Sequence, residues 1–151
     1  MNLENKYKLL SFNLKESELS LGEILSSSPN TLLYFYPKDN TPGCSTEGKD
    51  FTFLKNNFSN IGINIVGVSK DSIESHKKFI EKQDLKINLL SDPDLILHKE
   101  LGVYGEKMNY GKKIMGVIRS TFLFDKNGKL LKKWINVRAK GHAERILDEL
   151  S

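Results

Sequence analysis

The sequence predicts an α/β domain with a central mixed β-sheet flanked by helices, and three observations lead to this class. Short apolar runs typical of buried strands alternate with amphipathic segments typical of helices. Near the C-terminal end, two strand-like runs flank an Asn-Gly pair, which favours a hairpin. No repeat, low-complexity block or linker interrupts the chain, so we expect residues 1–151 to form a single domain.

The N-terminal half predicts alternating strands and helices. TLLYFY and INIVGVS are nearly continuous apolar runs, as expected of strands that are covered on both faces. After Cys44, Phe51, Leu54 and Phe58 recur at helical spacing and predict one helix. In order, we expect a strand at 7–14, a turn or short helix at 19–25, a strand at 31–36, the helix after Cys44, a strand at 63–69, and a helix capped by Asp71 or Ser72 that runs to about Lys82.

The C-terminal half predicts a hairpin and a last helix. Asn127-Gly128 is a pair that accepts the positive φ angles of a tight turn between two strands. In order, we expect a strand at 87–92, a small helix with Pro93 in its first turn that reaches Leu101, a Gly-rich loop at 106–116, hairpin strands at 120–125 and 130–137, and a helix from about His142 to Leu150.

Composition excludes several classes of function. The net charge of +4 comes mostly from lysines scattered among 19 acidic residues, with no basic stripe, so we expect no nucleic-acid partner. No segment has the length and apolarity of a signal peptide or membrane span, so we expect a cytoplasmic protein without a membrane partner. His76, His98 and His142 lie far apart in sequence and there is one cysteine, so we expect no metal or cofactor.

The only cysteine, Cys44, lies in the stretch YPKDNTPGCSTE at 36–47. The predicted strand and helix on either side place its thiol at the carboxyl end of a strand and in the first turn of a helix. A helix N-terminus favours an anion, so this position predicts a reactive thiolate. The alternative is a buried structural cysteine, which the polar neighbours TPG and STE disfavour.

These residues resemble the active-site signature of the peroxiredoxins. Pro37, Thr41 and Cys44 have the spacing P-x-x-x-T-x-x-C, and TPGCSTE, IRSTFLFDKNGK and VRAKGH are similar to the bacterioferritin comigratory protein or peroxiredoxin Q subfamily. The resemblance implies a thioredoxin-like fold. It also implies a thiol-dependent peroxidase that reduces hydrogen peroxide and organic hydroperoxides, with a sulfenic acid formed at Cys44.

The same resemblance assigns the other candidate catalytic residues. It gives Thr41 a hydroxyl that binds the peroxide, and Pro37 a lid that keeps water off the thiolate. Arg119 matches the family's arginine, whose planar fork can hold both thiolate and peroxide. Glu47, one helical turn after Cys44, either orients Arg119 or is simply an acid in the first part of a helix.

The number of cysteines predicts how the oxidised enzyme is reduced. Many family members carry a second cysteine five residues after the first, where this chain has Lys49. We therefore expect a one-cysteine peroxiredoxin, monomeric or weakly homodimeric, that depends on an external thiol such as thioredoxin, glutaredoxin or glutathione. A C-x-x-C oxidoreductase is disfavoured because position 47 is Glu47. The remaining alternative is a non-catalytic thioredoxin-fold binding or chaperone module.

Overall fold

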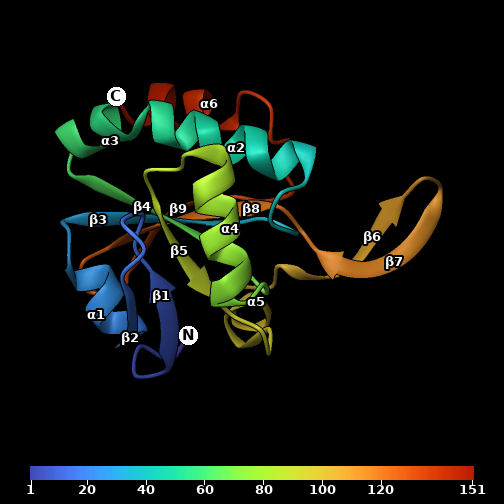
Figure 1. Cartoon of the computed structure of the whole chain (residues 1–151), viewed down its shortest axis with the longest axis horizontal. Helices are drawn as coiled ribbons and strands as arrows, with labels where there is room; N and C mark the ends of the chain where they lie inside the picture. The colour runs from blue at the N-terminus through green and yellow to red at the C-terminus, as the bar shows by residue number, and fades with distance from the viewer.

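A computed structural model describes residues 1–151, apart from the side chain of Asn109. Its centre is a seven-stranded mixed sheet in the order β2-β1-β5-β4-β3-β8-β9, flanked by helices (Figure 1). The predicted fold class is confirmed. The strands of this sheet are β1 Lys6–Leu10, β2 Glu16–Ser20, β3 Asn30–Phe35, β4 Ile63–Ser69, β5 Asn88–Ser91, β8 Ser120–Asp125 and β9 Leu130–Trp134.

The middle of the sheet is parallel and its margins are antiparallel. β4 pairs in parallel with both β3 and β5, which matches the apolar runs expected of strands covered on both faces. β8 runs antiparallel to β3, and β9 follows it at the edge. β1 pairs antiparallel with β5 and with β2. The carboxyl end of β3 therefore opens at the edge where parallel α/β sheets bind ligands.

Helices cover both faces of the sheet (Figure 1). They are α1 Leu21–Ser26, α2 Pro42–Phe53, α3 Lys55–Asn60, α4 Ile73–Gln83, α5 Ile96–Glu100 and α6 His142–Leu150. Residues of α2, α3, α4 and α6 pack on one face with Leu32 and Tyr34, while residues of α1 and α5 pack on the other with Leu33 and Phe35. Alternating residues of β3 thus serve two separate cores. Among the described helices, none combines the length and apolarity needed to cross a membrane.

The first strand is shorter than predicted and is followed by a second strand. β1 ends at Leu10, and the chain turns back through Leu14, whose φ is 69°. The segment ESELS then forms β2, which we did not predict because it lacks an apolar run. α1 begins after Ser20, whose side chain forms a capping box with Glu23, within the predicted turn or short helix.

Two helices differ from the prediction at their boundaries. The single helix expected after Cys44 is divided into α2 and α3 at Leu54, where φ is −94° and ψ is 4°. α5 begins at Ile96 and not at Pro93, because the Asp92 carboxylate accepts a hydrogen bond from the Ile96 N–H at 3.0 Å. By contrast, α4 begins after Ser72 as predicted, with the Ser72 side chain accepting a bond from the Ser75 N–H.

The prediction of a loop at 106–116 is wrong. It forms a two-stranded antiparallel ribbon of β6 Tyr104–Asn109 and β7 Lys112–Val117, which extends away from the main body (Figure 1). Tyr110 and Gly111, at its tip, have φ of 50° and 78°, the pair of positive angles typical of a tight hairpin turn. At the other hairpin, between β8 and β9, the positive angle falls on Gly128, at 85°.

Candidate active site

Cys44 is the third residue of α2, immediately beyond the loop that follows β3. Its residue exposure is 1%, so the thiol is buried at the base of the helix. The first N–H bonded within this turn is that of Ser45, which donates to the Thr41 carbonyl at 2.8 Å. The N–H groups of Gly43 and Cys44 precede it and are free of intrahelical acceptors by helix geometry. The predicted position of the thiol is confirmed.

Arg119 joins the thiol to an acidic side chain of the same helix. It lies between β7 and β8, and its Nη2 donates to Cys44 Sγ at 3.3 Å. Its Nη1 donates to Glu47 Oε1 at 2.5 Å. The Arg119 side chain is 16% exposed and that of Glu47 is fully buried. The structure therefore brings together Cys44, Glu47 and Arg119, three of the five candidate residues.

Burial controls the electrostatics of this cluster. Loss of solvation raises the pKa of Glu47 to about 7, and the attraction of Arg119 opposes it only in part. Burial also acts to lower the pKa of Arg119, but Glu47 and Cys44 outweigh it and raise that pKa. Burial, with Glu47 and Cys44 nearby, raises the pKa of Tyr34 well above its ordinary value. Arg119 is thus the fixed cation of the site and Tyr34 a neutral phenol.

Thr41 and Pro37 lie in the loop that leads to α2. Thr41 is the N-cap residue, but its side chain makes no capping bond. Its hydroxyl instead donates to the Lys38 carbonyl at 2.9 Å. A hydroxyl has one donor and two acceptor positions, so the remaining capacity of Thr41 Oγ1 is for accepting hydrogen bonds. Pro37 lines the same pocket as Arg119.

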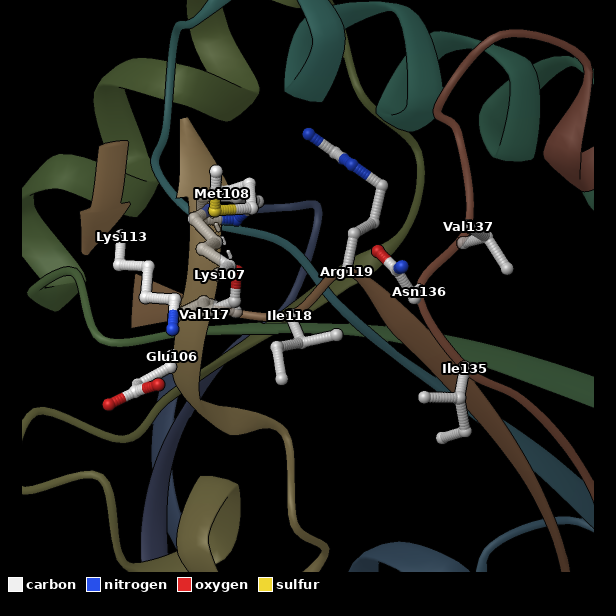
Figure 2. A pocket seen from close by; sticks show the side chains of 11 residues that line it. Glu106, Lys107, Met108, Lys113, Val117, Ile118, Arg119, Ile135, Asn136 and Val137 are labelled. Carbon is white, nitrogen blue, oxygen red and sulfur yellow. Dashed lines mark hydrogen bonds between the residues drawn. The ribbon is translucent and has the colours of Figure 1, made fainter. Parts of the chain in front are cut away.

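This pocket is open, has a volume of about 690 Å³, and lies beside Arg119. Figure 2 shows Arg119 extending from its floor toward α2, with the β6–β7 ribbon on one side and residues 135–137 on the other. The walls combine apolar and basic side chains, namely Met108, Val117, Ile118, Ile135, Val137, Lys107 and Lys113, with Pro37, Glu106, Asn136 and Arg119. The pocket can therefore admit a small molecule with an apolar part next to Arg119.

The packing of Gly43 against Arg119 and Ala139 was not identified from the sequence. A Cβ added at Gly43 would lie 3.4 Å from Arg119 Nη2 and 3.7 Å from the Cβ of Ala139. A side chain larger than alanine at position 43 would push against the guanidinium. The sequence offered one sign of this packing. A small residue stands directly before Cys44, and another stands in the VRAKGH segment, which also resembles the family.

The histidines take no part in this cluster. His142, the first residue of α6, lies with Nε2 2.8 Å from Thr121 Oγ1. Burial, together with Arg145 and Arg119, lowers its pKa to about 4, so the ring is neutral at physiological pH. Among the described side chains, no three His, Cys, Asp or Glu residues converge in a way that would hold a metal ion.

A single thiol at the start of a helix, after a central strand and beside a fixed arginine, fits the class of thioredoxin-like thiol enzymes, in which a helix N-terminus and a neighbouring cation favour a thiolate. Comparison with known proteins narrows this class. The AhpC/TSA family pattern matches residues 5–133. The chain therefore belongs to the AhpC/TSA family, and it is a peroxiredoxin of the one-cysteine type, a thiol-dependent peroxidase.

Several relatives are similar over most of their length. A putative peroxiredoxin bcp of Helicobacter pylori is 46% identical over 142 residues, which is 92% of each chain. Peroxiredoxin Bcp of Bacillus subtilis is 47% identical over 119 residues, 79% of this chain and 76% of the relative. The solved structure of a Xylella fastidiosa PrxQ mutant is 38% identical in sequence and matches with a TM-score of 0.86. The match covers 99% of this chain and 91% of the Xylella chain.

Proposed function

We propose that Cys44 is the peroxidatic residue and that it reduces hydrogen peroxide and organic hydroperoxides. The observation that carries this assignment is the contact of 3.3 Å between Arg119 Nη2 and Cys44 Sγ at the start of α2. A guanidinium and a helix N-terminus both stabilise a thiolate over a thiol. The solved structure of a Xanthomonas campestris bacterioferritin comigratory protein was studied for alkyl peroxide reduction, which supports the substrate class.

In the proposed reaction, the Cys44 thiolate attacks the terminal oxygen of the hydroperoxide. A sulfur–oxygen bond forms as the oxygen–oxygen bond breaks, so sulfur is oxidised and the peroxide is reduced. The leaving alkoxide takes a proton from solvent, and the products are Cys44 sulfenic acid and an alcohol, or water from hydrogen peroxide. Negative charge moves from sulfur to the leaving oxygen. The Arg119 guanidinium and the N–H groups of Gly43 and Cys44 are hydrogen-bond donors that are already in place, and they stabilise the charge on that oxygen.

The other candidate residues orient the substrate. Thr41 donates its hydroxyl hydrogen to the Lys38 carbonyl, so its oxygen is set to accept a hydrogen bond from the peroxide O–H. Pro37 forms part of the pocket wall beside Arg119. Its proposed role is to exclude water from the thiolate. Glu47 fixes one side of the guanidinium, which leaves the other side for sulfur and peroxide.

An external thiol completes the cycle, because this chain has one cysteine. The first thiol attacks the sulfenic sulfur and releases water, which leaves a mixed disulfide at Cys44. A second thiol attacks the mixed disulfide, which restores Cys44 and releases the oxidised reductant. We infer a reductant of the thioredoxin, glutaredoxin or glutathione kind. We also infer that residues 1–151 act as one domain, monomeric or weakly dimeric, in the reducing cytoplasm.

The test is peroxide consumption by wild type and Cys44→Ser with each of these three reductants in turn. The proposal predicts turnover by wild type with at least one reductant and none by the variant. A wild type that consumes no peroxide under any of the three conditions would favour the alternative, a non-catalytic binding or chaperone module. Activity that survives in Cys44→Ser would move the chemistry away from Cys44.

A further inference from the structure

A buried carboxylate lies inside the loop that carries Pro37 and Thr41. The side chain of Asp39 is 2% exposed. Its Oδ1 accepts a hydrogen bond of 2.6 Å from the Tyr36 hydroxyl. Its Oδ2 accepts one of 2.8 Å from the Ser75 hydroxyl and lies 2.7 Å from His76 Nδ1. A carboxylate with three partners is held far more firmly than a surface aspartate.

His76 ties this carboxylate to the central sheet. It lies in α4, its side chain is fully buried, and its Nε2 is 3.1 Å from the carbonyl oxygen of Leu90 in β5. Both ring nitrogens of His76 therefore face oxygen atoms, one on the active-site loop and one on the sheet. The backbone of the loop is fixed at the same place, because the Asp39 N–H donates to Asp71 Oδ2 at 2.9 Å.

We propose that Asp39 and His76 are positioning residues for the peroxidase reaction, since they fix the loop at 37–41 against α4 and β5. The proposal rests on the proposed roles of Pro37 and Thr41, which lie two residues on either side of Asp39. If the loop is already ordered before peroxide binds, the reaction does not have to supply the entropy cost of ordering it. A displacement of about 1 Å at a reacting group costs about 100-fold in rate, so a loosened loop slows the attack on peroxide.

The chain contains a matched control for this pair. Asp92 and His98 form a second buried pair with the same separation of 2.7 Å and the same side-chain exposures, 2% and 0%. The Asp92 carboxylate also makes three contacts, since it accepts bonds from the N–H groups of Ile96 and His98 and lies against the His98 ring. Those bonds stay within residues 92–98, whereas the bonds of Asp39 join α4 to the active-site loop.

The experiment compares Asp39→Asn with Asp92→Asn. Each replacement keeps the size of the side chain but turns an amide group toward hydrogen-bond donors. Three quantities are measured on each purified variant: the second-order rate constant with hydrogen peroxide, the rate of alkylation of Cys44 by iodoacetamide, and the midpoint of thermal unfolding. Iodoacetamide needs the thiol but not the proposed contacts of Thr41 with peroxide, so it reports on the reactivity and accessibility of the sulfur.

We expect both variants to unfold at lower temperature, and only Asp39→Asn to react at least 10-fold more slowly with peroxide while its alkylation is no slower than in wild type. An unchanged peroxide rate in folded Asp39→Asn overturns the proposal. An equal loss of peroxide rate in Asp92→Asn also overturns it, because the effect is then one of general destabilisation.

A milder variant serves if Asp39→Asn fails to fold. Ser75→Ala removes one donor to Asp39 while its own N–H still bonds to the Ser72 side chain. We expect a several-fold loss of the peroxide rate with unchanged alkylation, and no loss would overturn the proposal. Thr41→Val separates a failure of this proposal from a failure of the proposed function. If Thr41→Val reacts with peroxide at the wild-type rate, the proposed role of the loop at 37–41 is wrong, whatever the result for Asp39→Asn.

Discussion

Arg119 and Cys44 are 75 positions apart in sequence, yet Arg119 Nη2 lies 3.3 Å from the Cys44 sulfur. The other nitrogen of the same guanidinium contacts Glu47, one helical turn beyond the cysteine. One planar side chain thus links the start of α2 to the connection between β7 and β8. A planar fork with two donors suits this task, whereas a single ammonium group does not reach two separate partners in fixed directions.

Replacing Arg119 by lysine separates charge from geometry. Arg119→Lys keeps a cation but loses the fork that contacts both Glu47 and Cys44. We expect the second-order rate constant with peroxide to fall by about 100-fold, the scale of removing one donor that stabilises developing charge. Stopped-flow measurement of peroxide reduction tests this, with circular dichroism as the check on folding. A folded variant that reacts at nearly the wild-type rate would refute the assignment of Arg119.

The buried acid predicts a stability that changes with pH. The pKa of Glu47 rises from an ordinary 4.5 to about 7 on folding, so between these values the folded state binds more protons than the unfolded state. Stability therefore falls as pH rises through this window. Relative to Glu47→Gln, wild type should lose up to about 3 kcal/mol between pH 4.5 and 7, to judge from the size of the shift. Urea unfolding at several pH values measures the difference.

The pKa of His142 predicts that stability changes with pH in the opposite direction. Its pKa falls from an ordinary 6.5 to about 4 on folding, so in this window the unfolded state binds more protons. Stability should therefore fall as pH decreases from 6.5 to 4, and His142→Gln should lack this contribution. The two variants provide a control for each other: relative to wild type, their unfolding free energies should change with pH in opposite directions. Parallel changes would contradict both assignments.

Gly67 predicts a large cost for a single methyl group. It lies opposite Tyr34 in the β3–β4 pair, and an added Cβ would lie 2.9 Å from the Tyr34 hydroxyl oxygen and 2.8 Å from Leu89 Cδ2. We expect Gly67→Ala to lower the free energy of unfolding by about 1–3 kcal/mol through overpacking. Gly105→Ala is the control, because an added Cβ there has no described atom within 4 Å. Equal unfolding midpoints in urea would contradict the expected crowding around Tyr34.

The features that could be predicted from the sequence depend on local patterns. INIVGVS became β4 with its predicted bounds because its apolar run needs cover on both faces. α6 also has its predicted bounds, His142–Leu150. In contrast, the described side chains of β6 and β7 include Lys, Gly and exposed apolar residues and are mostly not buried, so hydrophobic periodicity gave no indication of a ladder.

Prediction of the candidate active site from the sequence is limited in the same way. The grouping of Pro37, Thr41 and Cys44 came from the resemblance of their spacing to the peroxiredoxin signature. The approach of Arg119 to Glu47 was available only through resemblance, since nothing local predicts a contact between residues 72 positions apart. The pair of Asp39 and His76 could not be predicted at all, because a histidine in a polar helix has the same local sequence whether its ring is exposed or buried.

The single cysteine predicts the fate of the oxidised enzyme. After one equivalent of peroxide, Cys44 should carry one added oxygen as sulfenic acid, because the chain has no second thiol to condense with it. Without an external thiol, turnover should stop there, and excess peroxide should drive the sulfur to sulfinic acid. Added glutathione, alone or with glutaredoxin, should give a mixed disulfide and restore turnover.

Intact-mass spectrometry after peroxide treatment measures these species directly. The main competing product is a disulfide between the Cys44 residues of two chains. We expect it to be minor, because the thiol is buried at 1% exposure and held beside Arg119, so two such sulfurs cannot meet without opening both sites. Cys44→Ser provides the control, since it should gain no peroxide-dependent mass at this position. A predominant disulfide-linked dimer, or wild-type protein without any oxygen adduct, would contradict the one-cysteine mechanism.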